Sequence, residues 1–133
     1  MKKYFIVFFA MTSMFLYWSC KDQDNSVIEM VTAEEMSDLL DQNNFKLLDV
    51  RTPAEFQTGA IENAVNMDYL SDAFNIQIKT LDPSEPIIVY CKSGGRSSAC
   101  AEFLEKNGFV KVYNLEGGIS QWTNLGLPVV SPD

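Results

Sequence analysis

Beyond residue 26, short apolar runs alternate with stretches whose apolar side chains recur at helical spacing. The most continuous run, residues 87–90, is β-branched and aromatic, which is typical of a buried central strand in a parallel sheet. Four further strands are predicted from the shorter apolar runs 27–30, 45–50, 64–67 and 110–113. Because strands that alternate with helices form a mostly parallel sheet, the pattern predicts an α/β fold.

Helix signals lie between the predicted strands. Thr32 and Glu35 have the spacing of a capping box, in which each side chain bonds to the backbone N–H of the other residue. Thr52 and Glu55 repeat this spacing with Pro53 at the first helical position, so Glu55 is interpreted as a capping residue rather than a catalytic acid. Three further helices are predicted over residues 71–79, 97–107 and 119–122.

The first twenty residues have a different character. Residues 1–3 include two lysines, and residues 4–18 carry no charge. That layout is typical of a secretory signal peptide, and the apolar run is shorter than the ~20 residues that a transmembrane helix needs. The pair Ser19-Cys20 at the end of the run resembles the lipobox of bacterial lipoproteins, in which the cysteine is acylated and becomes the mature N-terminus.

This resemblance implies a signal peptide over residues 1–19, a polar tether over 20–26 and a folded domain over 27–131. The mature protein would be exported and would lie in the periplasm or cell envelope, anchored by a lipid on Cys20. The alternatives are an ordinary signal peptide, or an uncleaved anchor, in which Cys20 has no special role.

Composition narrows the chemistry that the chain can perform. Its 133 residues carry 18 acidic and 10 basic side chains, and the net charge of -8 argues against non-specific binding to nucleic acid or to anionic lipid. The absence of histidine excludes a Ser-His-Asp triad, a Cys-His dyad and histidine metal ligands. A general base must therefore be a carboxylate, a lysine, a tyrosine or a thiolate. The cysteines at positions 20, 91 and 100 do not have the spacing of a zinc site.

A cysteine-containing loop follows the predicted central strand. Cys91 stands at the carboxyl end of that strand, where open α/β sheets bind their ligands. Gly94 and Gly95 allow successive backbone N–H groups to point inward at an anion, and the next helix adds the positive end of its dipole. With the charges of Lys92 and Arg96, these features favour the nucleophilic thiolate. The candidate site comprises Cys91 as the catalytic residue and a substrate-binding loop of Lys92, Ser93, Gly94, Gly95, Arg96 and Ser97.

The chain contains two arginines, which are interpreted differently. Arg96 suits a bidentate grip on a substrate oxyanion, which lysine performs less well. Arg51 follows an earlier strand and stands near Asp49, so these two residues are interpreted first as a structural ion pair that supports the loop. Cys100 lies along a helix from Cys91 at ~13 Å, a separation that is too long for a disulfide and favours a packing role.

Four sequence blocks stand in order along the chain: 48–56 with Asp-x-Arg-x-x-x-Glu, 59–66 with Gly-Ala-Ile and Ala-Val-Asn, 91–96 with Cys-x-x-Gly-x-Arg, and 117–122 with Gly-Gly-x-x-x-Trp. Together they resemble a rhodanese-like domain over residues 27–130. The resemblance implies a central, mostly parallel five-stranded sheet flanked by helices. The chain has Ala60 where the family commonly has histidine and Asn63 where it commonly has glycine, departures that affect fine geometry rather than the catalytic thiol.

The resemblance also implies sulfur transfer. Cys91 would attack the outer sulfur of a donor such as thiosulfate or a persulfide, become a persulfide itself, and pass that sulfur to cyanide or a thiol. The expected partners are a small anionic sulfur donor and a thiol or cyanide acceptor, with no nucleic acid, and no metal or organic cofactor is required. Contact with a membrane is expected only through the N-terminal signal or lipid.

Two other functions remain open at this point. Phosphatases of the dual-specificity type and arsenate reductases have related folds and a similar loop. The phosphatase loop places five residues between cysteine and arginine, whereas Cys91 and Arg96 have four between them, which favours sulfur chemistry. Alternatively, the domain binds a partner protein or delivers sulfur to it without acting as an enzyme.

Overall fold

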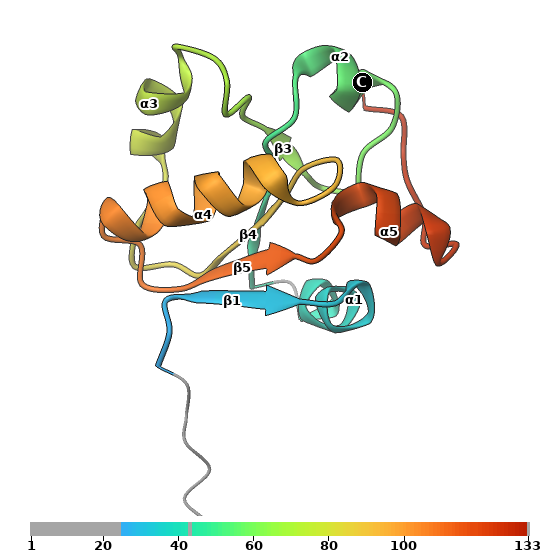
Figure 1. Ribbon diagram of the computed structural model, residues 1–133, viewed down its shortest axis with the longest axis horizontal. Coiled ribbons are helices and arrows are strands. Elements are labelled where there is room, and N and C mark those ends of the chain that lie inside the picture. The colour runs from blue at the N-terminus through green and yellow to red at the C-terminus, as the bar shows by residue number, and fades with distance from the viewer. Residues whose placement is uncertain (1–24, 43, 133) are drawn as a thin grey trace, which may run out of the picture.

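The computed structural model describes residues 25–42 and 44–132. At its centre is a five-stranded sheet in which every strand pairing is parallel, in the order β1-β5-β4-β2-β3 (Figure 1). The strands are β1 (Ile28–Val31), β2 (Lys46–Asp49), β3 (Val65–Asn66), β4 (Ile87–Tyr90) and β5 (Val112–Leu115). The predicted α/β fold with a five-stranded parallel sheet is confirmed.

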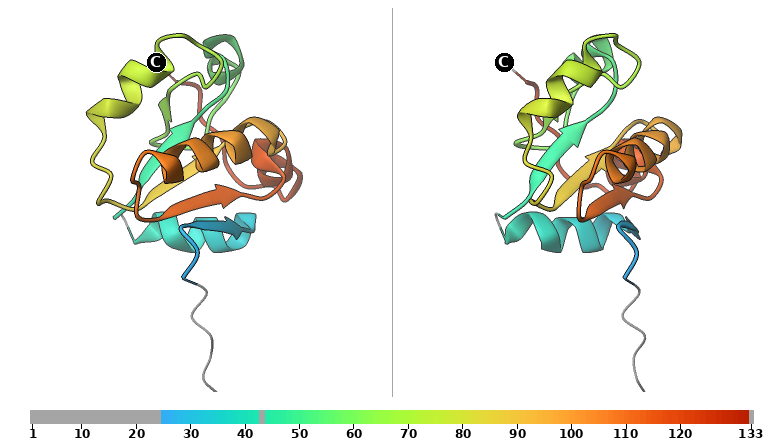
Figure 2. Two further views of the ribbon diagram at one scale, coloured as in Figure 1. Left: turned by 60° about the vertical axis from the view of Figure 1, so that its left-hand side comes forward. Right: turned by 90° about the vertical axis from the view of Figure 1, so that its left-hand side faces the viewer.

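Helices cover both faces of this sheet. They are α1 (Ala33–Asp41), α2 (Pro53–Gln57), α3 (Phe74–Gln77), α4 (Gly95–Lys106) and α5 (Gly118–Asn124), with a 3-10 turn η1 (Ile78–Thr80) after α3. Figure 2 shows α3 and α4 on one side of the sheet and α1 on the other. Side chains alternate along β4, so that Ile87 and Val89 pack with α3 and α4, whereas Ile88 and Tyr90 pack with α1 and α5. The central strand therefore contributes to both halves of the core.

Both predicted capping boxes are present. In α1 the Thr32 N–H donates to Glu35 Oε2 at 2.8 Å, and the Glu35 N–H donates to Thr32 Oγ1 at 3.2 Å. In α2 the Thr52 N–H donates to Glu55 Oε2 at 3.1 Å, and the Glu55 N–H donates to Thr52 Oγ1 at 3.3 Å. The second box fixes the position of the Glu55 carboxylate, which contacts Arg96 of the cysteine loop.

Some element boundaries differ from those predicted. β5 begins two residues late because pairing with β4 starts where Ile87 faces Val112, while the Val110 N–H donates to Pro83 O at 3.0 Å. The helix predicted over 71–79 is replaced by the short α3 and η1, because its first residues form turns in which side chains accept hydrogen bonds from the backbone. The other four strands agree with the prediction to within one residue at each end.

The predicted signal peptide over 1–19, the lipidation candidate Cys20 and the tether as far as residue 24 lie outside the described residues. Within 25–42 and 44–132, none of the helices has the length and apolar character needed to cross a membrane.

Candidate active site

The cysteine loop lies at the carboxyl end of β4 and is held in place by α5. Gly94 has φ +112°, a left-handed conformation that allows the chain to turn directly into α4 at Gly95, two residues before the predicted start. From α5, the N–H of Ile119 donates to Cys91 O at 2.9 Å and the N–H of Ser120 donates to Lys92 O at 3.0 Å. The first turn of α5 therefore positions the backbone that carries the cysteine.

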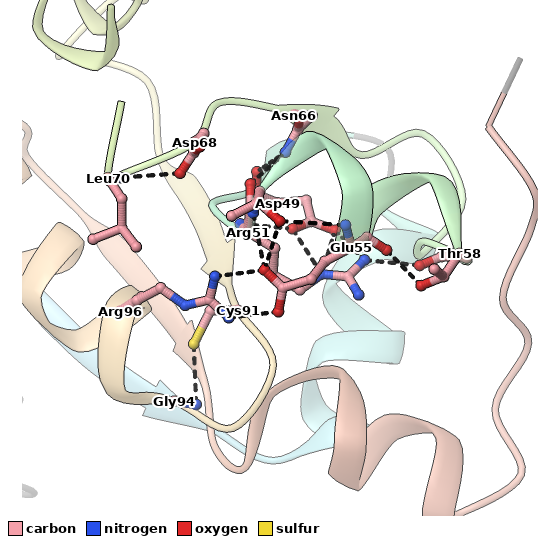
Figure 3. A network of polar contacts seen from close by, with 12 residues as sticks. Asp49, Arg51, Glu55, Thr58, Asn66, Asp68, Leu70, Cys91, Gly94 and Arg96 are labelled. Carbon is pink, nitrogen blue, oxygen red and sulfur yellow. Dashed lines mark hydrogen bonds and ion pairs between the residues drawn. The ribbon is translucent and has the colours of Figure 1, made fainter. Parts of the chain in front are cut away.

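The Cys91 sulfur is buried and surrounded by hydrogen-bond donors. The Gly94 N–H donates to its Sγ at 3.1 Å (Figure 3). Burial alone would raise the pKa of Cys91, but hydrogen bonds from the Ser97 hydroxyl and from the N–H groups of Ser97, Gly94 and Ser93 outweigh it, so the pKa lies below its ordinary value. The loop therefore favours the thiolate, the form that acts as a nucleophile.

A chain of hydroxyl and amide groups behind the loop supports this arrangement. The Ser98 hydroxyl donates to Gly94 O at 2.7 Å, and Asn114 on β5 donates through Nδ2 to Ser98 Oγ at 3.0 Å. The Ser97 hydroxyl also lies 3.2 Å from Gly94 O. Gly94 O also accepts from the Ser98 N–H at 3.0 Å, so the N–H and hydroxyl of Ser98 fill both of its lone pairs. The Ser97 proton, which donates to the same oxygen, can therefore turn to the sulfur when the thiolate forms. Sequence reasoning missed Ser98 and Asn114, since neither falls in a motif.

Replacing Ser97 with alanine is expected to raise the pKa of Cys91, because it removes a hydrogen bond to the charged thiolate, and such a bond contributes about 1.5–3 kcal/mol. The measurement is the rate of Cys91 alkylation as a function of pH. Ser93→Ala is the matched control, because the N–H of Ser93 faces the sulfur and survives the change. Identical pH profiles for Ser97→Ala and the wild-type protein would show that the hydroxyl does not stabilise the thiolate.

The guanidinium of Arg96, which the sequence suggested as a grip for a substrate oxyanion, contacts a carboxylate in this structure. Its Nη1 donates to Glu55 Oε2 at 2.7 Å and its Nη2 to Glu55 Oε1 at 2.8 Å, a bidentate ion pair (Figure 3). The hydrogen bond from Arg96 is the main reason that the pKa of Glu55 falls to about 2, with help from Thr52. Sequence reasoning assigned Glu55 to the capping box alone, and no local spacing connects it to an arginine in another segment.

Asp49 and Arg51 form a second bidentate ion pair, which is buried. Arg51 Nη2 donates to Asp49 Oδ2 at 2.6 Å and to Gly59 O at 2.7 Å, and its Nε lies 3.0 Å from both Asp49 oxygens. Arg51 thus joins the end of β2 to the segment after α2. This is the structural ion pair that the sequence suggested, and it positions the helix that carries Glu55.

The two residues that depart from the family pattern have clear places in the fold. Asn63 has φ +63°, a left-handed conformation that explains why glycine is common there, and asparagine is among the residues that tolerate it best. Ala60 is buried and forms an antiparallel bridge with Val130, with backbone hydrogen bonds of 2.9 and 2.8 Å. Neither residue belongs to the loop around the sulfur.

Cys100 lies in the core below the loop. It is fully buried, and neither it nor Cys91 is in a disulfide. Burial raises the pKa of Cys100 to about 12, with a contribution from the charge of Cys91. A thiol of this kind stays protonated at neutral pH, so Cys91 is the more readily ionised thiol of the pair.

A pocket of about 550 Å³ opens beside the loop, between α2 and α5. Its polar lining includes Glu55 from α2, Lys92 from the loop and Ser120 from α5. The Lys92 side chain is exposed at this rim. Among the residues that the structure describes, no group of three or more cysteine, aspartate or glutamate side chains is arranged to hold a metal ion.

Comparisons with known proteins agree with this fold. The family model described as "Rhodanese-like domain" matches residues 32–125. A sulfurtransferase of Allochromatium vinosum is 32% identical over 108 residues, covering 80% of this chain and 99% of that protein. The crystal structure of a rhodanese-related protein from Thermoplasma volcanium has a TM-score of 0.70 and 31% identity, covering 78% of this chain and 99% of that one.

The chain therefore belongs to the rhodanese-like domain family. The family also contributes domains to larger proteins. A tRNA uridine(34) hydroxylase of Photorhabdus laumondii is 31% identical over 111 residues, and the match covers 76% of this chain but only 31% of that enzyme. This chain thus corresponds to about a third of the hydroxylase.

Proposed function

We propose that this protein is a sulfurtransferase of the rhodanese type, which moves a sulfane sulfur through a persulfide on Cys91. The observation that carries the proposal is the set of N–H and hydroxyl donors around the Cys91 sulfur, which lowers its pKa. A loop that stabilises a thiolate also suits the terminal sulfur of a persulfide, because both carry negative charge. The similarity to the Allochromatium vinosum sulfurtransferase over nearly the whole of that protein supports the same activity.

The reaction would proceed in two displacements. The Cys91 thiolate attacks the outer sulfur of thiosulfate or of a persulfide, the donor S–S bond breaks, and sulfite or a thiolate leaves with the electron pair. In the second step, cyanide or an acceptor thiolate attacks the outer sulfur of the Cys91 persulfide, and the Cys91 thiolate leaves. The two half-reactions predict ping-pong kinetics. The loop N–H groups and the Ser97 hydroxyl hold the negative charge in each state.

Phosphate chemistry is less well supported. Four residues separate Cys91 from Arg96, one fewer than in the phosphatase pattern. In addition, the guanidinium of Arg96 is already engaged by Glu55, although phosphate recognition relies on such a fork. A dedicated sulfur carrier would form the same persulfide but would not turn over with a small acceptor.

Intact mass is expected to show one added sulfur after incubation with thiosulfate or with a small organic persulfide. Cys91→Ser should show none, whereas Cys100→Ala should retain it, because Cys100 is buried and protonated. Subsequent addition of cyanide or a thiol should remove the added sulfur, repeatedly for an enzyme. If neither donor modifies Cys91, or if aryl phosphates turn over faster than sulfur is transferred, the proposal is wrong.

We also propose that the protein is exported and lipid-anchored at Cys20, on the strength of the basic start, the apolar run and the Ser19-Cys20 pair. Expression of the full chain in a bacterium with labelled fatty acid should yield labelled protein in the membrane fraction. Cys20→Ser is expected to lose the label. Unlabelled wild-type protein that retains Met1 and stays in the cytoplasm would contradict the proposal.

A further inference from the structure

The carboxylate nearest to the loop arginine is held firmly in place. Besides the two bonds from Arg96, Glu55 Oε2 accepts from the Thr52 N–H at 3.1 Å and from Thr52 Oγ1 at 2.9 Å. Glu55 is thus fixed from two sides, by the helix cap beneath it and by the guanidinium in front of it. Its side chain is 31% exposed, so it faces the approach to the loop rather than the core.

The charges around the sulfur come from several elements. α2 contributes Glu55, the segment after β3 contributes Asp68, whose charge acts on Arg96, and the loop contributes Lys92 at its exposed rim. The buried Asp49 and Arg51 compensate each other, and α5 carries no charged residue. Around the Cys91 thiolate, the one guanidinium at the mouth of the loop is therefore balanced by a fixed carboxylate.

From this arrangement we infer that Glu55 is a specificity-determining residue, which makes the site prefer persulfides on neutral or cationic carriers to the thiosulfate dianion. The inference rests on the proposed function and identifies its class of donor. A dianion meets the negative charge of Glu55 as well as that of the thiolate, and it binds Arg96 only by displacing a bidentate carboxylate. A persulfide on a neutral carrier has at most one negative charge, which the loop N–H groups accommodate.

Glu55→Gln tests this directly. Glutamine retains the capping box and the side-chain volume but removes the charge and weakens the hold on Arg96. The rate of Cys91 persulfidation by thiosulfate is expected to rise about tenfold, since one unit charge close to a dianion is removed. The rate with the persulfide of 2-mercaptoethanol, whose carrier is neutral, is expected to change less than about threefold.

Glu35→Gln is the matched control, because Glu35 occupies the same position in the α1 capping box and forms no ion pair with the residues that the structure describes. It should leave both persulfidation rates unchanged. A second readout needs no sulfur transfer: the ratio of Cys91 alkylation rates with iodoacetate and iodoacetamide, which differ in charge. Glu55→Gln is expected to raise this ratio about threefold, because iodoacetate carries one negative charge where thiosulfate carries two, and Glu35→Gln is not.

The outcomes separate this inference from the proposed function. If the wild-type protein transfers sulfur but Glu55→Gln leaves both the donor ratio and the alkylation ratio unchanged, the inference is overturned and the function stands. If neither donor modifies wild-type Cys91, the proposed function fails, and the donor preference fails with it. A shift in both ratios with Glu55→Gln alone supports the inference.

Discussion

Asp49→Asn is expected to lower the free energy of unfolding by about 3–5 kcal/mol, because it leaves the buried guanidinium of Arg51 without a compensating charge. Asp49 is fully buried and Arg51 is 4% exposed, so water cannot replace the lost partner. Arg51 also lies 5.8 Å from the ring centroid of Tyr90, and any shift of its side chain would disturb that contact. Urea unfolding of the purified domain measures the loss.

The control for this prediction is an exposed ion pair on the same sheet. Glu29 on β1 pairs with Lys111 at 2.6 Å, but the Glu29 side chain is 51% exposed. Glu29→Gln should therefore cost less than about 1 kcal/mol, because solvent and salt screen the pair. Equal losses for Glu29→Gln and Asp49→Asn would contradict the structural role of the buried pair.

Gly118→Ala is expected to cost more than about 3 kcal/mol and to disrupt the cysteine loop. Gly118 has φ +59°, and a Cβ built on it would lie 2.5 Å from the carbonyl oxygens of both Cys91 and Lys92. Those oxygens belong to the backbone, so the clash can be relieved only by separating α5 from the loop. The expected results are a lower melting temperature and, in the protein that remains folded, altered alkylation kinetics of Cys91.

Gly126→Ala separates the clash from the backbone strain. Gly126 also has a positive φ, +75°, but a Cβ there would have no neighbour within 4 Å. Its replacement should cost only about 1–2 kcal/mol of strain and leave the reactivity of Cys91 unchanged. If both glycine variants lose stability equally, the close approach of α5 to the loop is not the cause of the loss in Gly118→Ala.

The elements that could be predicted from sequence are those whose signals are local. β4 was predicted residue for residue, because four consecutive apolar β-formers suit only a strand buried on both faces. The two capping boxes were predicted because each needs only a threonine and a glutamate three residues apart. The position of Cys91 followed from the same logic, since a cysteine after a central strand lies at the ligand-binding edge of a parallel sheet.

The contacts that could not be predicted join distant segments. The spacing of Glu55 had a complete local explanation in the α2 cap, and its bond to Arg96 depends on how α2 docks beside the loop. Asn114 lies in a strand whose sequence gives no sign that its amide reaches Ser98. One local boundary also differs: the predicted start of α4, residue 97, lies two residues after the observed start at Gly95. The helix can begin there because Gly94 adopts a left-handed conformation.

The order of strands in the sheet also has a consequence for how the nascent chain folds. β1 is the first strand to be synthesised, but among the described residues it pairs with β5 alone, with Ile28 facing Val112. The ammonium of Lys111 then bonds to Ser26 O at 3.1 Å, fastening the late strand to the early one. β1 has to remain unpaired until the ribosome has completed most of the domain, because β5 is the last strand to be synthesised. Such non-local parallel pairing is also slow. A chain that stops before Val112 would expose the apolar edge of β4 to pairing with other molecules.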